Sequence, residues 1–114
     1  RAASIMLAKE GATIIGIDKE KKSLEKLKSK LKKNLVIKNI DCTKIKEINN
    51  KLNDVKKLDG LINCAGIVPQ GNLMDCNEIE WQHSINTNLT SVYLMTKYFM
   101  PIFIKQKIIR LSHK

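Results

Sequence analysis

The residues best suited to place a ligand against the backbone lie in residues 58–66. This segment begins with the apolar residues of a short buried strand and ends in Asn63, Cys64, Ala65 and Gly66. Small residues where a strand ends let a backbone come close to a ligand. Ligands of open α/β sheets bind at this carboxyl edge. The segment therefore indicates a nucleotide-binding sheet, and the alternative is a tight turn that serves packing alone.

Asp18 provides a carboxylate at the end of another short apolar run. An acidic residue at the end of the second strand of a dinucleotide-binding fold accepts hydrogen bonds from the ribose hydroxyls of adenosine. Its charge repels a 2′-phosphate and so favours NAD over NADP, although Lys19, Lys21 and Lys22 leave room for NADP. The alternative role of Asp18 is a helix cap that stabilises the first turn after the strand.

Two further polar positions follow along the chain. Asp41 ends the next apolar run, and its carboxylate could accept a hydrogen bond from the amino group of adenine. A helix cap formed together with Thr43 explains Asp41 at least as well. Asn88 opens a long apolar stretch, and an asparagine at a helix start is by itself most often only a cap.

An alternation of helical and strand patterns places these residues. Apolar spacing predicts helices over residues 2–10, 19–33, 45–55, 75–83 and 88–106. Apolar, β-branched runs predict strands over residues 13–17, 35–40 and 58–63, and a fourth strand that begins at 108–111. Gly11 is a stop signal for the first helix, and Pro101 should kink the last helix or mark its late part. The alternation predicts a parallel sheet with helices on both faces.

Composition limits the possible classes of protein. The chain has 114 residues, of which 43% are hydrophobic, as expected of one small globular domain. The net charge is +10, but residues 19–57 hold many lysines and no aromatic residue that could stack on a base, which argues against a nucleic-acid partner. The three cysteines and two histidines lack metal-ligand spacing, so we expect no metal site. No apolar run has membrane-spanning length.

The order of these motifs resembles the short-chain dehydrogenase/reductase family over residues 1–106. The motifs that carry the resemblance are Leu-Ala-Lys-Glu-Gly-Ala at 7–12, Ile-Gly-Ile-Asp at 15–18, Asp-Cys-Thr at 41–43, Asn-Cys-Ala-Gly at 63–66 and the stretch 81–89. They look like the helix after the glycine-rich loop, the strand with the NAD-selecting acid, the adenine contact, the Asn-Asn-Ala-Gly signature and the region of the catalytic asparagine. Cys64 departs from the second Asn of that signature.

The resemblance implies an α/β fold with a partial Rossmann-type, doubly wound parallel sheet. The first strand and the C-terminal third of that fold would lie outside residues 1–114, which would form a single incomplete NAD(P)-binding domain. Because the first strand lies between the second and the fourth in such sheets, the strands that end at Ile17 and Asn63 would flank an empty position. We therefore expect unpaired backbone edges on both.

Specific roles follow from the resemblance. The implied cofactor-binding residues are Asp18, Asp41, Cys42, Asn63, Ala65 and Gly66. Asp18 would bind the adenosine ribose, and the motif of Asp41 and Cys42 would contact adenine. Asn88 would be the catalytic asparagine, ordering the water of the proton relay and holding a bend in its helix.

Other parts of the family's machinery are expected outside this sequence. The glycine-rich loop should end just before Arg1, and the Tyr-x-x-x-Lys pair should lie beyond Lys114, so residues 1–114 alone should be inactive. Tyr93 and Lys97 have this spacing by accident, since they lie inside the long helix. If residues 108–112 form the fourth strand, His113 occupies the approximate place of the catalytic serine.

The implied activity is NAD-dependent hydride transfer between nicotinamide and a secondary alcohol or ketone. Residues 71–76, 84–88 and 91–97 further resemble a cytoplasmic branch that acts on small hydroxy or oxo acids, such as 3-hydroxybutyrate or 4-oxoproline. Family members are usually homotetramers, and the apolar helix from Asn88 would suit a subunit interface. The alternatives are a non-catalytic truncated product, a reductase of another carbonyl compound and a basic nucleic-acid binder.

Overall fold

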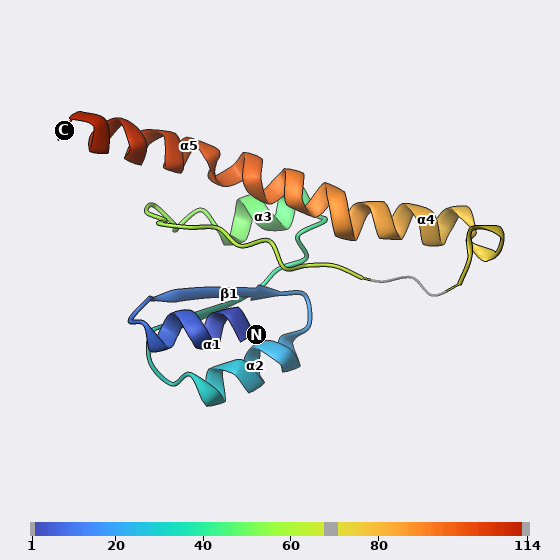
Figure 1. The fold of residues 1–114 in the computed structure, drawn as a ribbon, viewed down its shortest axis with the longest axis horizontal. Coiled ribbons are helices and arrows are strands. Elements are labelled where there is room, and N and C mark those ends of the chain that lie inside the picture. The colour runs from blue at the N-terminus through green and yellow to red at the C-terminus, as the bar shows by residue number, and fades with distance from the viewer. Residues whose placement is uncertain (1, 68–70, 113–114) are drawn as a thin grey trace. The chain divides into compact units, whose positions relative to one another are not determined.

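A pair of parallel strands forms the sheet of this chain. The computed structural model describes residues 2–67 and 71–112, with only the backbone for 107–112, and these residues fall into two compact units, Arg1–Asp41 and Cys42–Lys114. In the first unit, β1 (Ile14–Asp18) pairs with β2 (Leu35–Asn39), and Asp18 lies opposite Asn39. Helices α1 (Ala2–Lys9) and α2 (Lys21–Lys30) lie on the same side of this pair (Figure 1). The predicted α/β class with a partial parallel sheet is confirmed.

The core of the first unit forms where α2 packs on the strands. Leu24 and Leu27 lie on one face of α2 and are buried together with Leu35 and Ile40. A Cβ on Gly16 would lie 3.4 Å from Leu35 Cδ1 and 3.7 Å from Leu27 Cδ2. The missing side chain of Gly16 therefore lets the leucines of α2 approach β1 closely. The helical spacing of leucines among lysines correctly predicted this buried face.

The first helix ends at the predicted glycine. The amide of Gly11 donates to the carbonyl of Ala8, and the amide of Ala12 donates to the carbonyl of Leu7. These two bonds are those of a Schellman motif, and Gly11 has the positive φ of 89° that this motif requires. Gly11 thus turns the chain from α1 into β1 at a backbone conformation that other residues rarely adopt.

Helices dominate the second unit. Its elements are α3 (Ile45–Lys51), the short 3₁₀ helix η1 (Leu73–Asp75), α4 (Glu78–Ile85), the π-helical turn η2 (Asn86–Thr90) and α5 (Ser91–Ser112). The last three follow one another as a single long helical run, and α3 packs against α5 (Figure 1). The buried apolar residues of this unit are Ile48, Leu52, Val55, Met95 and Phe99. No helix in the described ranges is long and apolar enough to span a membrane.

Two predicted strands do not form. Residues 58–63, predicted as the third strand, lie outside any strand, and residues 108–111, predicted to begin a fourth, belong to α5. A strand exists only where a neighbouring backbone completes its hydrogen-bond ladder, and no strand in the described ranges pairs with residues 58–63. Pro101 lies inside α5 without ending it, since a proline removes one amide donor and the helix continues beyond it.

The conformation of Gly11 yields the first test. Gly11→Ala should lower the free energy of unfolding of the first unit by about 1 kcal/mol, because a Cβ is unfavourable at positive φ. Gly11→Asn should cost less, since asparagine tolerates this conformation. Chemical denaturation measures both. Gly60→Ala is the matched control, because a Cβ at either glycine meets no atom within 4 Å and only Gly11 has a positive φ. Equal losses in the two alanine variants would contradict this assignment.

Candidate functional site

The geometry of Asp18 is compatible with both roles considered for it, a helix-start contact and an acceptor for a ligand. Its Oδ1 accepts a hydrogen bond of 2.9 Å from the amide of Glu20, which is the N-cap residue of α2 and makes no side-chain capping bond of its own. One carboxylate oxygen therefore supports the start of α2. No donor in the described part of the chain bonds the other oxygen, Oδ2. The carboxylate keeps an acceptor for a ligand while it stabilises the turn.

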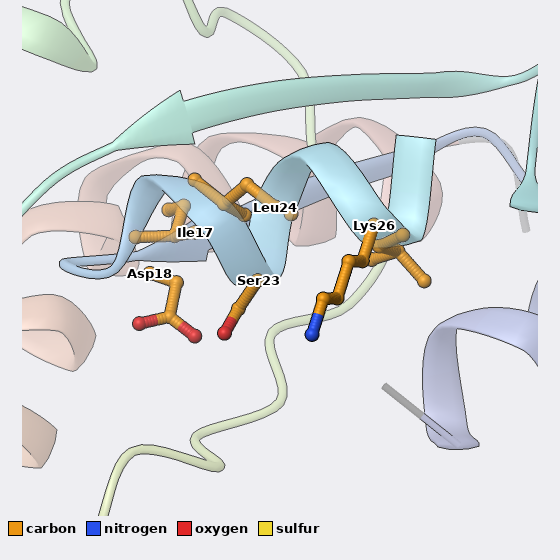
Figure 2. Close-up of a pocket in the computed structure, with 7 residues that line it drawn as sticks. Ile17, Asp18, Ser23, Leu24 and Lys26 are labelled. Carbon is orange, nitrogen blue, oxygen red and sulfur yellow. The ribbon is translucent and has the colours of Figure 1, made fainter. Parts of the chain in front are cut away.

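A cavity of about 310 Å³ lies beside this carboxylate. Gly16, Ile17 and Asp18 of β1 line it together with Ser23, Leu24, Lys26 and Leu27 of α2. Figure 2 shows the carboxylate of Asp18, the hydroxyl of Ser23 and the amine of Lys26 pointing to the same side of the strand. The volume lies at the lower end of the range of small-molecule sites. The site can accept hydrogen bonds at Asp18 and donate them from Ser23 and Lys26.

Asp41 comes to the same edge of the sheet as Asp18. The amide of Ile40 donates to the carbonyl of Asp18 at 3.1 Å, and the side-chain amide of Asn39 bonds the carbonyls of Asp18 and Lys19, both at 2.9 Å. These bonds join the carboxyl ends of β1 and β2. The N-cap of α3 is Lys44, without a side-chain capping bond, so Thr43 does not occupy the cap position that the alternative assigned to it.

Asn88 lies in the π-helical turn η2, inside a continuous helical run, and is not the start of a helix. Its Oδ1 accepts from the amide of Ile67 at 2.7 Å, and its Nδ2 donates to the carbonyl of Ile67 at 2.9 Å and to Ser84 Oγ at 3.2 Å. We use the term amide clamp for a side-chain amide that bonds both the N–H and the C=O of one residue. The alternative cap role is thus wrong, because the side chain of Asn88 bonds another segment. π-helical turns often lie at functional sites.

Gly66 is shaped by the same contact. A Cβ on Gly66 would lie 3.0 Å from Oδ1 of Asn88, closer than a packed side chain normally comes. Asn63 Nδ2 contacts Thr96 Oγ1 of α5 at 3.4 Å, and Ala65 is exposed. The structure therefore brings Asn63, Ala65 and Gly66 to the helix that carries Asn88.

The predicted site residues thus form two groups. Asp18 and Asp41 lie at one edge of the two-stranded sheet of the first unit, and Cys42 directly follows Asp41 as a half-buried thiol. Asn63, Ala65, Gly66 and Asn88 lie together in the second unit. No cluster of three or more His, Cys, Asp or Glu in the described ranges could hold a metal ion.

Sequence analysis missed three residues that act on the same segment. Ser84 and Thr96 bond Asn88 and Asn63, and the Gln106 side chain bonds both backbone groups of Leu58. The sequence signal that could have indicated these three residues is a polar side chain at helical spacing within an otherwise apolar helix.

Tyr93 and Lys97, whose spacing imitates a catalytic pair, are an ordinary i, i+4 pair on the exposed surface of α5. Lys97 Nζ lies 3.2 Å from the Tyr93 hydroxyl.

Comparison with known proteins identifies the family. The family model described as short chain dehydrogenase matches residues 1–110, so this chain belongs to the short-chain dehydrogenase family. It is 37% identical over 107 residues to dehydrogenase/reductase SDR family member 6 of Xenopus laevis, covering 94% of this chain and 43% of that protein. It is 32% identical over 114 residues to the 3-oxoacyl-[acyl-carrier-protein] reductase FabG of Thermotoga maritima, covering 94% of this chain and 46% of that reductase.

Solved structures have the same fold. Serine dehydrogenase from Escherichia coli matches with a TM-score of 0.80 at 23% identity, over 86% of this chain and 47% of that structure. ElxO with NADP bound matches with a TM-score of 0.73 at 21% identity, over 92% of this chain and 45% of that structure. The chain therefore spans less than half the length of the relatives and structures named here.

The contact between Gly66 and Asn88 yields the second test. Gly66→Ala should destabilise the second unit by about 1–3 kcal/mol, because the new Cβ would lie 3.0 Å from Oδ1 of Asn88, whose amide must then shift against Ile67. Chemical denaturation should show this loss, and the NMR signals of the Asn88 side-chain amide should shift. Gly60→Ala again serves as the control, since its Cβ would meet no atom within 4 Å. Unchanged Asn88 signals in Gly66→Ala would show that the clamp does not depend on this glycine.

Proposed function

We propose that this chain is part of an NAD-dependent oxidoreductase that transfers a hydride between nicotinamide and a secondary alcohol or ketone. The single observation that carries the proposal is the carboxylate of Asp18. It lies at the end of β1 beside a cavity of about 310 Å³, and one of its oxygens is left without a donor in the described part of the chain. Two ribose hydroxyls are donors that match such an acceptor, and the family of the chain makes this ligand the natural one.

The charge at this position supports NAD over NADP. A 2′-phosphate placed beside the Asp18 carboxylate would bring like charges together, which is unfavourable by several kcal/mol at low effective dielectric. Lys26 is the counter-argument, because its amine reaches toward the same cavity (Figure 2). No ion pair joins Lys26 to Asp18 in the described residues, so the carboxylate keeps its full charge toward a ligand. We therefore assign NAD as the preferred cofactor.

The residues that would surround the nicotinamide ring belong to the second unit. Asn88 and the turn of Asn63, Ala65 and Gly66 suit the nicotinamide half of the cofactor, because a backbone that ends in small residues allows close approach. The bound nicotinamide would supply or accept the hydride. Asn88 holds Ile67 through both polar atoms of its side chain, and from this turn it would order a water of the proton relay. Asp41 and Cys42 would contact adenine.

The similarity to SDR family member 6 also suggests the substrate. We infer a small hydroxy or oxo acid, with 3-hydroxybutyrate and 4-oxoproline as the first compounds to test.

The long helical run would suit the subunit interface of a homotetramer. Its exposed apolar side chains include Leu89, Tyr93, Met100 and Ile104. A cytoplasmic enzyme with thiols that remain reduced fits the absence of any disulfide among the three cysteines.

Substitution of Asp18 tests the cofactor site. In the full-length protein, Asp18→Asn should weaken NADH binding by about tenfold, the loss of roughly 1.4 kcal/mol of charge-assisted hydrogen bonding. NADPH binding should be unchanged or tighter, because the repulsion of the 2′-phosphate is removed. Titration of the cofactor's fluorescence measures both. Glu20→Gln is the control, since the neighbouring side chain is exposed and only its backbone amide contacts Asp18. Equal weakening of both cofactors would contradict the proposed role.

Direct assay tests the reaction. The full-length protein should oxidise 3-hydroxybutyrate with NAD or reduce 4-oxoproline with NADH, followed by absorbance of the reduced cofactor. Asp18→Asn should raise KM for the cofactor while kcat falls less, because the ribose contact lies far from the carbon that receives the hydride. Turnover of neither compound would remove the substrate assignment. Retained NADH binding would still leave the oxidoreductase assignment standing.

A further inference from the structure

The side chain of Asn39 bonds the turn between β1 and α2 from the neighbouring strand. Asn39 is the last residue of β2 and lies opposite Asp18, the last residue of β1. Its Nδ2 donates to the carbonyls of Asp18 and Lys19, both at 2.9 Å. The side-chain amide of asparagine has two donor hydrogens, so one nitrogen can serve both carbonyls. Asn39 therefore orients two successive peptide groups where the chain leaves the sheet.

The second of these peptide groups also carries the amide that meets the Asp18 carboxylate. It joins Lys19 to Glu20, so it contains the carbonyl of Lys19 and the amide of Glu20. The carbonyl accepts from Asn39, and the amide donates to Asp18 Oδ1 at 2.9 Å. In a planar trans peptide the C=O and the N–H point in opposite directions. Asn39 and the Asp18 carboxylate therefore bond opposite sides of one rigid plane.

This plane couples Asn39 to the carboxylate. If the plane rotates, the Glu20 amide moves away from Oδ1 of Asp18. The bond to Asn39 opposes this rotation, because Asn39 belongs to a strand that pairs with β1 up to this point. The amide of Ile40 adds a bond of 3.1 Å to the Asp18 carbonyl. A donor at a carbonyl also polarises the peptide group, which strengthens donation from its amide.

The direction of Oδ1 determines the direction of the second carboxylate oxygen. The two oxygens are fixed to one carbon, so a bond at Oδ1 restricts rotation of the whole group about its side-chain torsions. Figure 2 shows the carboxylate of Asp18 on the side of the strand where Ser23 and Lys26 line the cavity. Oδ2 is the oxygen that the proposed function assigns to the ligand. Its position thus depends on the peptide that Asn39 holds.

We infer that Asn39 is a positioning residue for the cofactor-binding carboxylate. Through the peptide of Lys19 and Glu20 it sets the direction of the Asp18 side chain, and so contributes to the discrimination between NAD and NADP. Asn39 needs no contact with the cofactor in this role. The consequence for binding rests on the proposed function. The coupling between Asn39 and the Glu20 amide does not depend on that function.

Amide hydrogen exchange of the full-length protein, resolved by residue, tests the coupling. Asn39→Leu has a side chain of similar size without donors, and it should speed exchange of the Glu20 amide about three- to tenfold. Asn39→Gln keeps the amide on a chain that is one methylene longer, so it should have a smaller effect and covers the case in which the leucine variant fails to fold. Val36→Thr, at an exposed position of the same strand, should change nothing.

Two other amides distinguish positioning from general loosening. The amide of Ile14 donates to the carbonyl of Asn34 at the opposite end of the strand pair, and Leu27 is buried in α2. Both should keep their wild-type exchange rates in the Asn39 variants. A wild-type rate at Glu20 in Asn39→Leu would overturn the inference. Equal acceleration at Glu20, Ile14 and Leu27 would also overturn it, since Asn39 would then serve only general stability.

A double-mutant cycle on the full-length protein tests the consequence for binding. Asn39→Leu should weaken NADH binding about three- to fivefold and leave NADPH binding within about twofold, because only NADH uses the directed carboxylate. In an Asp18→Ala background, Asn39→Leu should change NADH binding by less than about 1.5-fold, since the group that Asn39 positions is gone. Equal weakening in both backgrounds would overturn the role in binding, because a purely structural effect is additive.

The two parts of the inference and the proposed function fail in different ways. Faster exchange at Glu20 together with wild-type NADH binding in Asn39→Leu would overturn the role in cofactor discrimination and leave the coupling in place. Failure of the unsubstituted protein to bind NADH would instead contradict the proposed function, and the exchange result would remain intact.

Discussion

Two side-chain amides, those of Asn88 and Gln106, join residues 58–67 to the helical run of the second unit. Where a backbone approaches a helix it exchanges bonds to water for bonds to the protein, and a group that is buried without a partner costs about 1–3 kcal/mol. The described sequence offers no strand for this purpose. The helix instead presents the side-chain amides of Asn88 and Gln106, which each have a donor and an acceptor and can match a peptide group. Each of these side chains therefore bonds both polar backbone groups of one residue in the segment.

In the first unit, Asp18 both stabilises the start of α2 and belongs to the proposed ligand site. Asp18 uses one oxygen to support the start of α2 and keeps the other beside the cavity. A carboxylate can do both because its two oxygens together provide about four acceptor sites. The side-chain amide of Asn39 bonds the carbonyls of Asp18 and Lys19 and so fixes the end of β1. The contacts that hold Asp18 in place thus leave the second oxygen of its carboxylate available for the proposed ligand.

Sequence patterns predicted the first unit well because its contacts are close in sequence. The strand at β1, the leucine face of α2 and the stop at Gly11 each follow from a few neighbouring residues. The patterns failed where structure depends on distant partners. Residues 58–63 have the composition of a buried strand, yet composition cannot provide the neighbouring backbone that a strand requires. Asn88 has the type of a cap, yet its partner at Ile67 lies in another segment.

The sequence by itself determined the family, the α/β class and the residue types at the carboxyl edge of the sheet, because these follow from local motifs in a fixed order. Only the tertiary structure decided what those residues contact. It placed Asn88 in a π-helical turn, showed that a Cβ at Gly66 would crowd the side chain of Asn88, and revealed Gln106 as the partner of Leu58. The physical reason is that a hydrogen bond depends on distance and direction between atoms, and residues 48 positions apart meet only after the chain has folded.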